Sequence, residues 1–211
     1  QGESNAGNTS RYAELVSSLI TNWRELWNMP EMPFLLMQLP NFMQKHDKPT
    51  DSGWARIREA QLQAFKTIPN TALAVTYDVG EWNDIHPLNK KDMAKRLFLG
   101  ARKVIYGEKL VYAGPVYKDM KVEGNKIIIT FTETGRGLMA KGGILKHFAI
   151  AGEDRQFVWA DAVIRGNKVI VSSKDVKQPV AVRYAWSDNP EDANLCNKEG
   201  LLASPFRTDN W

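Results

Sequence analysis

Apolar residues in the first half of the chain follow two spacings. Three stretches place them three and four residues apart, as on one face of a helix: residues 12–27, residues 52–67 and a stretch that begins after Asn89. Two short apolar runs lie between them, at 33–40 and 71–76, and favour buried strands. This alternation is typical of a layered α/β sheet, so residues 1–109 are predicted to form the second half of such a domain.

The second half of the chain has a shorter period. Strand-like segments are separated by Gly, Asn and Asp turns, a pattern that predicts antiparallel β structure, most simply a sandwich, over residues 110–211. The predicted strands are 118–122, 126–132, 145–151, 156–164, 167–172 and 179–185. We place the boundary between the two regions near residues 108–114. Residues 187–211 are polar with scattered aromatic residues, and no regular element is predicted there.

Composition and charge exclude several classes of protein function. The chain has 211 residues, of which 43% are apolar and 25% charged, and its net charge is +4. No apolar run approaches the ~20 residues of a membrane span, and the charge is spread evenly along the chain. We therefore expect neither a membrane span nor a basic stripe for nucleic acid. The single Cys196 excludes an intrachain disulfide, and no Cys/His cluster has zinc spacing.

The first eight residues form a turn-rich run that leads directly into the first predicted helix. Because native N-termini are usually weakly structured, we interpret the sequence as the C-terminal portion of a larger protein. A glycine-containing turn before a helix can present backbone N–H groups to an anion, and the side-chain amide of Gln1 or Asn5 can add an oxyanion donor. The alternative is a plain turn and helix cap.

His86 is the strongest catalytic candidate among three histidines. His46 lies in a hydrophilic loop and His147 in a predicted strand, where a solvated and a partly buried residue are expected. His86 lies in the loop after a buried strand, where ligands gather in open α/β sheets. Asp84 and Asp78 are close in sequence, and a histidine oriented by a carboxylate is the general base of a Ser-His-Asp system. The alternative is that Asp84 and His86 only cap the next helix.

Several short motifs, in this order, resemble the sialate O-acetylesterase family. They are Gln1-Gly2-Glu3-Ser4-Asn5, Asp84-Ile85-His86-Pro87 with Asn89-Lys90, Val182-Arg183-Tyr184-Ala185-Trp186 with Asn189-Pro190, and Asn197 with Pro205-Phe206-Arg207-Thr208-Asp209. The resemblance covers essentially the whole chain. It implies the C-terminal half of a flavodoxin-like SGNH-type hydrolase domain, followed by the antiparallel β-sandwich-like region.

The resemblance also implies a reaction. A serine attacks the acetyl group of an O-acetylated sugar, most simply 9-O-acetyl sialic acid, and His86 acts as its base. The first block, with Gln1, Gly2 and Asn5, resembles the family's oxyanion block. No cofactor or metal is implied.

The acid that orients His86 is left open by the sequence. The wider superfamily places it three residues before the histidine, and that position holds Asn83, which has no negative charge. Asp84 is the first choice and Asp78 the second. A histidine held only by a backbone carbonyl is a further alternative.

The nucleophile is missing. The family's serine lies far upstream in a Gly-Gln-Ser-Asn block, and no such block is present. Ser4 is the closest match to this serine, but the chain between Ser4 and His86 contains too few strands for a doubly wound sheet. We therefore expect activity only with an N-terminal segment that supplies the serine.

Two function classes follow. The first is the fragment of a carbohydrate O-acetylesterase, with an O-acetylated sugar and the missing N-terminal segment as partners. By resemblance to bacterial relatives, this protein is expected to be periplasmic or secreted. The second is a non-catalytic carbohydrate-binding or structural module, whose exposed Trp186, Phe206 and Trp211 stack on sugars.

Overall fold

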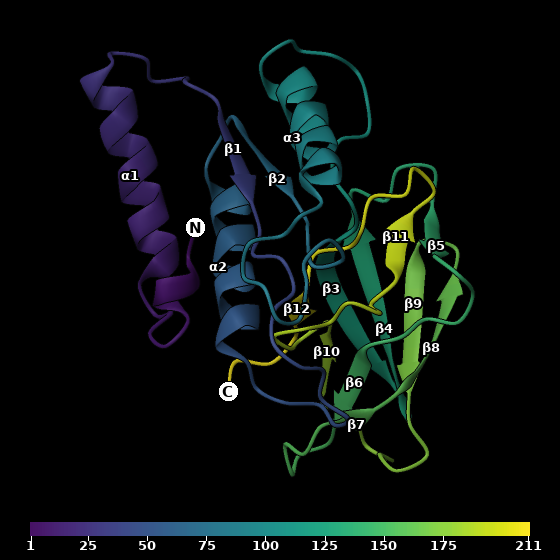
Figure 1. Ribbon diagram of the computed structural model, residues 1–211. Coiled ribbons are helices and arrows are strands. Elements are labelled where there is room, and N and C mark those ends of the chain that lie inside the picture. Colours follow the sequence, from purple (N-terminus) through teal and green to yellow (C-terminus); the bar gives the residue numbers. More distant parts are fainter.

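The computed structural model describes all residues, 1–211, and orders the first half as the apolar spacing predicts (Figure 1). A short 3-10 turn, η1, precedes three helices and two strands. Their bounds are η1 Glu3–Asn5, α1 Tyr12–Leu26, β1 Phe34–Met37, α2 Gly53–Thr67, β2 Thr71–Ala74 and α3 Lys90–Val104. The predicted sequence of helix, strand, helix, strand, loop and helix is confirmed.

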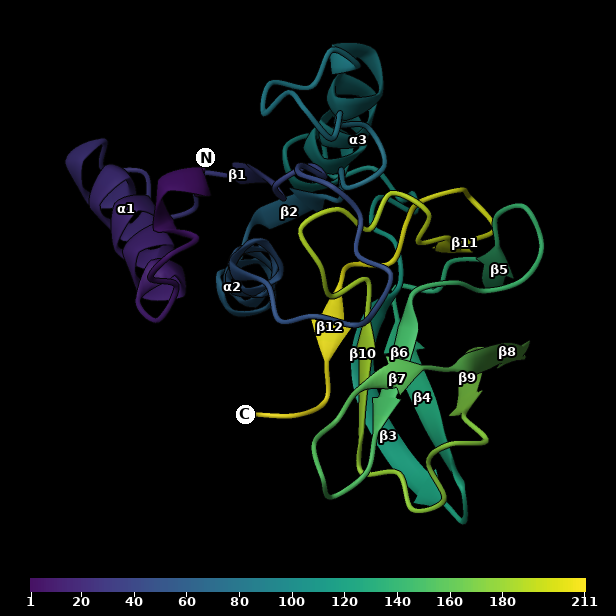
Figure 2. The same cartoon turned by 60° about the horizontal axis from the view of Figure 1, so that its bottom comes forward.

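β1 and β2 form a parallel pair with helices on both sides. Phe34 lies opposite Thr71 and Met37 opposite Ala74. Figure 2 shows α2 and α3 on opposite faces of this pair. The helix α3 approaches closely because it carries Gly100, where an added Cβ would lie 2.7 Å from that of Ala72. Side-chain caps fix where α2 and α3 begin: Ser52 accepts from the N–H of Ala55 at 3.0 Å, and Asn89 from that of Asp92 at 3.2 Å.

The apolar face of α1 is largely exposed, although its spacing is that of a helix packed against a core. Only Tyr12 and Ile20 are buried. Four large apolar side chains of the helix, and Trp27 directly after it, are between 49% and 78% exposed; the four are Leu15, Leu19, Trp23 and Leu26. The physical reason is the position of α1, which lies beyond β1, on the side away from β2 (Figure 1), and packs mainly against α2.

The second half forms two four-stranded antiparallel sheets and a two-stranded pair. The strand orders are β12-β10-β6-β7, β3-β4-β9-β8 and β11-β5. The bounds are β3 Val116–Glu123, β4 Lys126–Thr132, β5 Leu138–Ala140, β6 Phe148–Ala151, β7 Val158–Trp159, β8 Asp161–Arg165, β9 Lys168–Ser172, β10 Ala181–Tyr184, β11 Leu195–Asn197 and β12 Phe206–Arg207. One cluster of 22 buried apolar residues includes members of both four-stranded sheets, such as Ile129 and Ile150. The antiparallel character is confirmed.

One predicted strand is divided. Residues 156–164 contain β7, which pairs with β6, and β8, which pairs with β9. The chain therefore passes from one four-stranded sheet to the other at Ala160. A continuous strand was predicted because no glycine, asparagine or proline separates the two strands there.

The C-terminal tail is ordered, which the sequence did not predict. Residues 187–211 contain β11 and β12 and return to the first half of the chain. Ser204 Oγ accepts from Gln38 Nε2 at 2.8 Å. The fully buried guanidinium of Arg58 donates to the carbonyls of Ser187 and Asp188 at 2.8 and 3.0 Å. Such contacts are set by tertiary neighbours and leave no period in the sequence.

Candidate functional site

The loop between β2 and α3 places Asp84 beside His86. Asp84 Oδ1 accepts the backbone N–H of His86 at 2.8 Å and lies 3.6 Å from His86 Nδ1. The loop closes on itself through an isolated bridge between Glu81 and Asp84. The His86 side chain is 87% exposed and that of Asp84 is 47% exposed. Because Nδ1 faces the carboxylate, Nε2 is the ring nitrogen free to accept a proton from outside the loop.

Asp78 forms an ion pair with Arg96 of α3. Its two carboxylate oxygens accept from Arg96 Nη1 and Nη2 of α3 at 2.6 and 2.8 Å, and both side chains are less than one-fifth exposed. Arg96 also donates to the Val75 carbonyl at 2.5 Å. This bidentate pair ties the start of the loop to α3. The structure brings Asp84 to His86 and holds Asp78 in a separate ion pair.

The N-terminal block, residues 1–5, packs against α1 and α2. Gly2 has a φ of 129°, and an added Cβ would lie 2.9 Å from both Ile57 Cγ2 and Tyr12 Oη, so only glycine fits. The Tyr12 hydroxyl donates to Gln1 Oε1 at 2.6 Å. Burial raises the pKa of the Tyr12 phenol, which keeps it a donor. The carbonyl of Gln1 also accepts from Gln61 Nε2 at 3.0 Å.

The block offers fewer backbone donors than the sequence suggests. The N–H groups of Asn5 and Ala6 bond within the turn, to the carbonyls of Gly2 and Glu3 at 2.9 and 3.1 Å. The half-buried side chain of Asn5 faces a groove that Gln1 also lines. Ser4 is exposed. The rest of this groove is lined by residues of α1, β1 and Gln61, and no residue of the His86 loop lines it.

The His86 loop and the N-terminal block meet on one apolar cluster. The cluster consists of Tyr12, Leu39, Trp54 and Ile57. Ile85, which precedes His86, and Ala6, which follows Asn5, both pack against it. Both segments therefore lie at the carboxyl ends of the parallel strands, where α/β sheets place their ligands.

The other two histidines have the burial that the sequence predicts, but His147 lies just before β6, with a φ of 62°, and not within the predicted strand. His46 is exposed, with Nε2 3.7 Å from Asp188 Oδ2. His147 is half-buried against Trp159, and burial lowers the pKa of its imidazole. Neither lies in the segments that carry His86 and Asn5.

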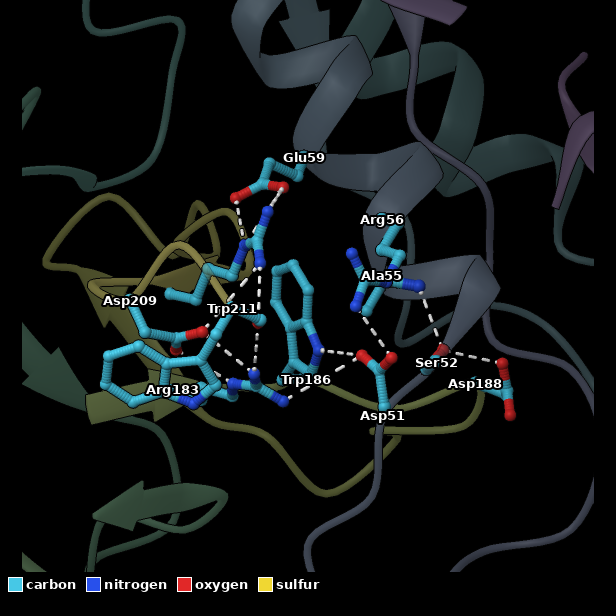
Figure 3. Close-up of polar contacts among 11 residues, drawn as sticks. Asp51, Ser52, Ala55, Arg56, Glu59, Arg183, Trp186, Asp188, Asp209 and Trp211 are labelled. Atoms are coloured by element: carbon cyan, nitrogen blue, oxygen red, sulfur yellow. Dashed lines mark hydrogen bonds and ion pairs between the residues drawn. The ribbon is translucent and has the colours of Figure 1, made fainter. Parts of the chain in front are cut away.

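A second polar cluster joins β10, β12 and α2 (Figure 3). Arg183 pairs with Asp209 at 2.8 Å, and the Asp209 side chain is fully buried. Arg207 pairs with Glu59 of α2 at 2.9 Å, and both guanidinium groups lie over the Trp186 ring, at 5.5 and 5.2 Å from its centroid. Sequence reasoning missed this cluster, although its signal was present in residues 182–186 and 205–209. These motifs hold the tail in place.

The prediction that exposed aromatic rings in the second half of the chain stack on sugars is wrong. Trp186 is 6% exposed and Phe206 is 3% exposed. Phe206 packs against Tyr117, Phe131, Phe148 and Tyr184. Trp211 is only partly exposed and lies under the guanidinium of Arg155. Trp186 and Phe206 therefore present no face to a sugar, and the guanidinium of Arg155 covers one face of Trp211.

No helix is both long enough and apolar enough to cross a membrane. No three His, Cys, Asp or Glu side chains gather where they could hold a metal ion.

Comparison with known proteins identifies the class and then the family. No protein-family profile matches the chain. The fold superimposes on a carbohydrate acetylesterase from Xanthomonas citri with a TM-score of 0.95 and 46% identity, over 100% of this chain and 49% of that one. The fold is thus that of part of a carbohydrate acetylesterase.

Sialate O-acetylesterases from Mus musculus and Homo sapiens are 31% and 32% identical to the chain over 98% of its length. The chain is a member of this sialate O-acetylesterase-like family, as its motifs predict. It spans 42% and 44% of the length of these two relatives.

Proposed function

We propose that the chain carries the general base and an oxyanion donor of a serine-type carbohydrate O-acetylesterase. The observation that carries the proposal is the contact of Asp84 with the Nδ1 side of an exposed His86, at the carboxyl ends of two parallel strands. Helices on both faces of these strands support the flavodoxin-like SGNH interpretation. Two four-stranded sheets around one core support a β-sandwich-like region.

In the proposed reaction, a serine from the segment that precedes Gln1 attacks the acetyl carbonyl of the sugar ester. His86 Nε2 takes the serine proton, and Asp84 stabilises the imidazolium through Nδ1. The side-chain amide of Asn5 donates to the oxyanion. The sugar oxygen leaves with the proton from His86, and water, activated by His86, then hydrolyses the acetyl-serine to acetate. The 9-O-acetyl group of sialic acid is the proposed substrate, and a periplasmic or secreted location suits a glycan substrate.

The serine is proposed to lie outside this chain because Ser4 has no catalytic setting. It is exposed in a three-residue turn, and no hydrogen bond joins it to His86. The curated relatives are more than twice as long as the matched region, which leaves room for the nucleophile.

The test uses a chimera that joins, ahead of Gln1, the preceding part of the Xanthomonas citri acetylesterase. His86→Ala in the chimera should lower kcat for p-nitrophenyl acetate and for 9-O-acetyl sialic acid by ~10²–10⁴-fold or more, with an unchanged circular dichroism spectrum. His46→Ala is the matched control, since that histidine is also exposed in a loop, and it should keep the parent rate. A His86→Ala variant that retains more than about a tenth of kcat would assign His86 to helix capping.

A further inference from the structure

Trp82 is the one tryptophan of the chain whose indole has no hydrogen bond, aromatic pair or cation–π contact, and it is 53% exposed. Each of the other six has such a partner, an aromatic ring, a carbonyl, a carboxylate or a guanidinium: Trp23, Trp27, Trp54, Trp159, Trp186 and Trp211. Single exposed apolar side chains are common on protein surfaces. The place of Trp82 in the fold therefore decides what its ring can do.

Trp82 lies in the His86 loop, four residues before the proposed base. Even a fully extended chain would place the Cα atoms of the two residues no more than about 14 Å apart. The bridge between Glu81 and Asp84 turns the chain back on itself between them, which shortens this span. Trp82 is therefore close enough to contact a glycan whose acetyl ester lies at His86.

Buried contacts hold this loop in one shape. Asn41, which is 1% exposed, accepts the backbone N–H of Gly80 through its Oδ1 at 2.7 Å. The two segments touch so closely that a Cβ at Gly80 would lie 2.3 Å from the carbonyl oxygen of Asn41. Ile85 packs against the apolar cluster beneath the loop. The exposed side chains of Trp82 and His86 are thus carried by one preorganised segment, which lowers the cost of ordering them on a ligand.

The chemistry of the loop surface suits a sugar ring. One face of a pyranose carries C–H groups, which pack on an aromatic face, and its hydroxyls need hydrogen-bond partners. Asn83, next to Trp82, is exposed, and its side-chain amide has no hydrogen-bond partner within the chain. An amide offers both a donor and acceptors to hydroxyl groups. Ring and amide together offer the stacking and the hydrogen bonds that a pyranose requires.

We propose that Trp82 is the surface on which a pyranose ring of the acetylated glycan stacks, and that the amide of Asn83 bonds to its hydroxyls. The inference rests on the proposed function for the position of the acetyl group, at His86. It makes the loop of the proposed base also the part of this chain that binds sugar. The reaction then prefers an acetyl group carried by a sugar over one carried by a small alcohol.

The first test compares two esters in the chimera. Trp82→Ala should raise KM for 9-O-acetyl sialic acid by about five- to tenfold and leave kcat near the parent value, since a stacked ring binds ground state and transition state alike. The kcat/KM for ethyl acetate should stay within about twofold of the parent, because this ester has no ring to stack. Trp82→Phe keeps an aromatic face and should restore most of the affinity.

Phe98→Ala is the matched control, since Phe98 is 59% exposed but lies in α3, outside the loop. It should change the kinetics of neither ester. A Trp82→Ala variant that loses kcat/KM equally for both esters would show that the ring only keeps the loop in shape, and would overturn the proposal. An unchanged KM for 9-O-acetyl sialic acid would overturn it as well.

The indole signal of Trp82 in an NMR spectrum of the ¹⁵N-labelled chimera tests binding without relying on catalysis. The signal that disappears in Trp82→Phe identifies its Nε1–H. Sialic acid, the deacetylated product, should shift this signal at about 10 mM, a concentration above the usual range of KM values, and acetate alone should not. A signal that sialic acid leaves unshifted would overturn the proposal.

The two readouts separate this inference from the proposed function. A sialic acid shift at Trp82 in a folded chimera without esterase activity would support the sugar-binding surface and contradict the function. An active chimera in which Trp82→Ala keeps the parent KM would support the function and overturn the inference.

Discussion

The two halves of the chain differ in how completely they bury their apolar residues. The second half has one cluster of 22 buried apolar residues, to which Val75 and Tyr77 of the first half also contribute. The other buried clusters, in or next to the first half, have four and three members. β2 is buried throughout, whereas every residue of β1 is only half-buried. The β region is therefore closed, and the α/β region is open at the free edge of β1.

This difference separates the residues that fold the chain from those that would act on a substrate. The buried ion pairs of the β region, such as Arg183 with Asp209, have all their partners within the chain. His86 is exposed and Asn5 is half-buried, both at the carboxyl ends of the parallel strands. We expect substitutions in the β region to change stability and substitutions in the open region to change activity.

The largest expected effect distinguishes the two aspartates of the His86 loop. In the chimera, Asp84→Asn should lower kcat by up to about 10⁴-fold with little change in KM, because the lost charge stabilises the imidazolium only during attack. Asp78→Asn should instead weaken the ion pair with Arg96 and lower the free energy of unfolding by about 1.5–3 kcal/mol. Steady-state kinetics and urea unfolding of both variants check this.

A large loss of kcat for Asp78→Asn alone would transfer the orienting role to Asp78. Near-parent rates for both variants would indicate a Ser-His dyad in which a backbone carbonyl orients His86. Asn83, which stands where the wider superfamily has its acid, would then mark a true loss of that acid.

In the β region, Asp209→Asn should destabilise the chain without touching the reaction. The substitution leaves the nearly buried Arg183 with only Asp51, 3.8 Å away and half-exposed, as a charged partner. Since breaking a buried pair typically costs about 3–5 kcal/mol of unfolding free energy, we expect a loss at the lower end of that range. Glu123→Gln is the control, since Glu123 pairs with Lys121 at the exposed surface, and it should leave the melting temperature unchanged. A chimera with Asp209→Asn that is folded but catalytically dead would contradict the division between the two regions.

The periodic parts of the fold were predictable from the sequence. The helices and strands of the first half were found because their apolar spacing is set by local geometry, and the Ser52 and Asn89 caps depend on residues only three positions apart. The loop containing His86 was predictable because it lies between a strand and a helix that this spacing identifies. Asp84 was favoured over Asp78 from proximity alone, and the structure adds the reason in the Arg96 pair.

The remainder depends on contacts between distant residues. Nothing near Trp186 or Phe206 in the sequence shows that their rings are covered by Arg207 and by strands of both sheets. The opposite holds for α1, whose sequence pattern is that of a buried helix face although that face is exposed. The amphipathic pattern of Leu15, Leu19 and Trp23 is the same whether or not the covering element is present, so the pattern identifies a helix but not its burial.

The smallest expected effect is a pH dependence of stability in the β region. Burial lowers the pKa of His147 from its ordinary value of 6.5, so the folded state favours the neutral ring. The unfolded chain takes up the proton first on acidification, and stability should therefore fall as the pH drops below about 6.5. His147→Asn, which suits the φ of 62° at this position, should reduce this fall. Melting temperatures at pH 7.5 and 5.5 measure it, and an equal fall in both proteins would exclude His147 as its source.

The most direct test compares acetate release by the 211-residue chain with that by the chimera, together with labelling by a fluorophosphonate. We predict that the chain alone releases no acetate from p-nitrophenyl acetate or 9-O-acetyl sialic acid above buffer and takes up no label. The chimera should turn over both substrates and be labelled on a serine ahead of Gln1. A burst of p-nitrophenol from the isolated chain, with label on Ser4, would contradict the conclusion that the catalytic half is completed by another segment.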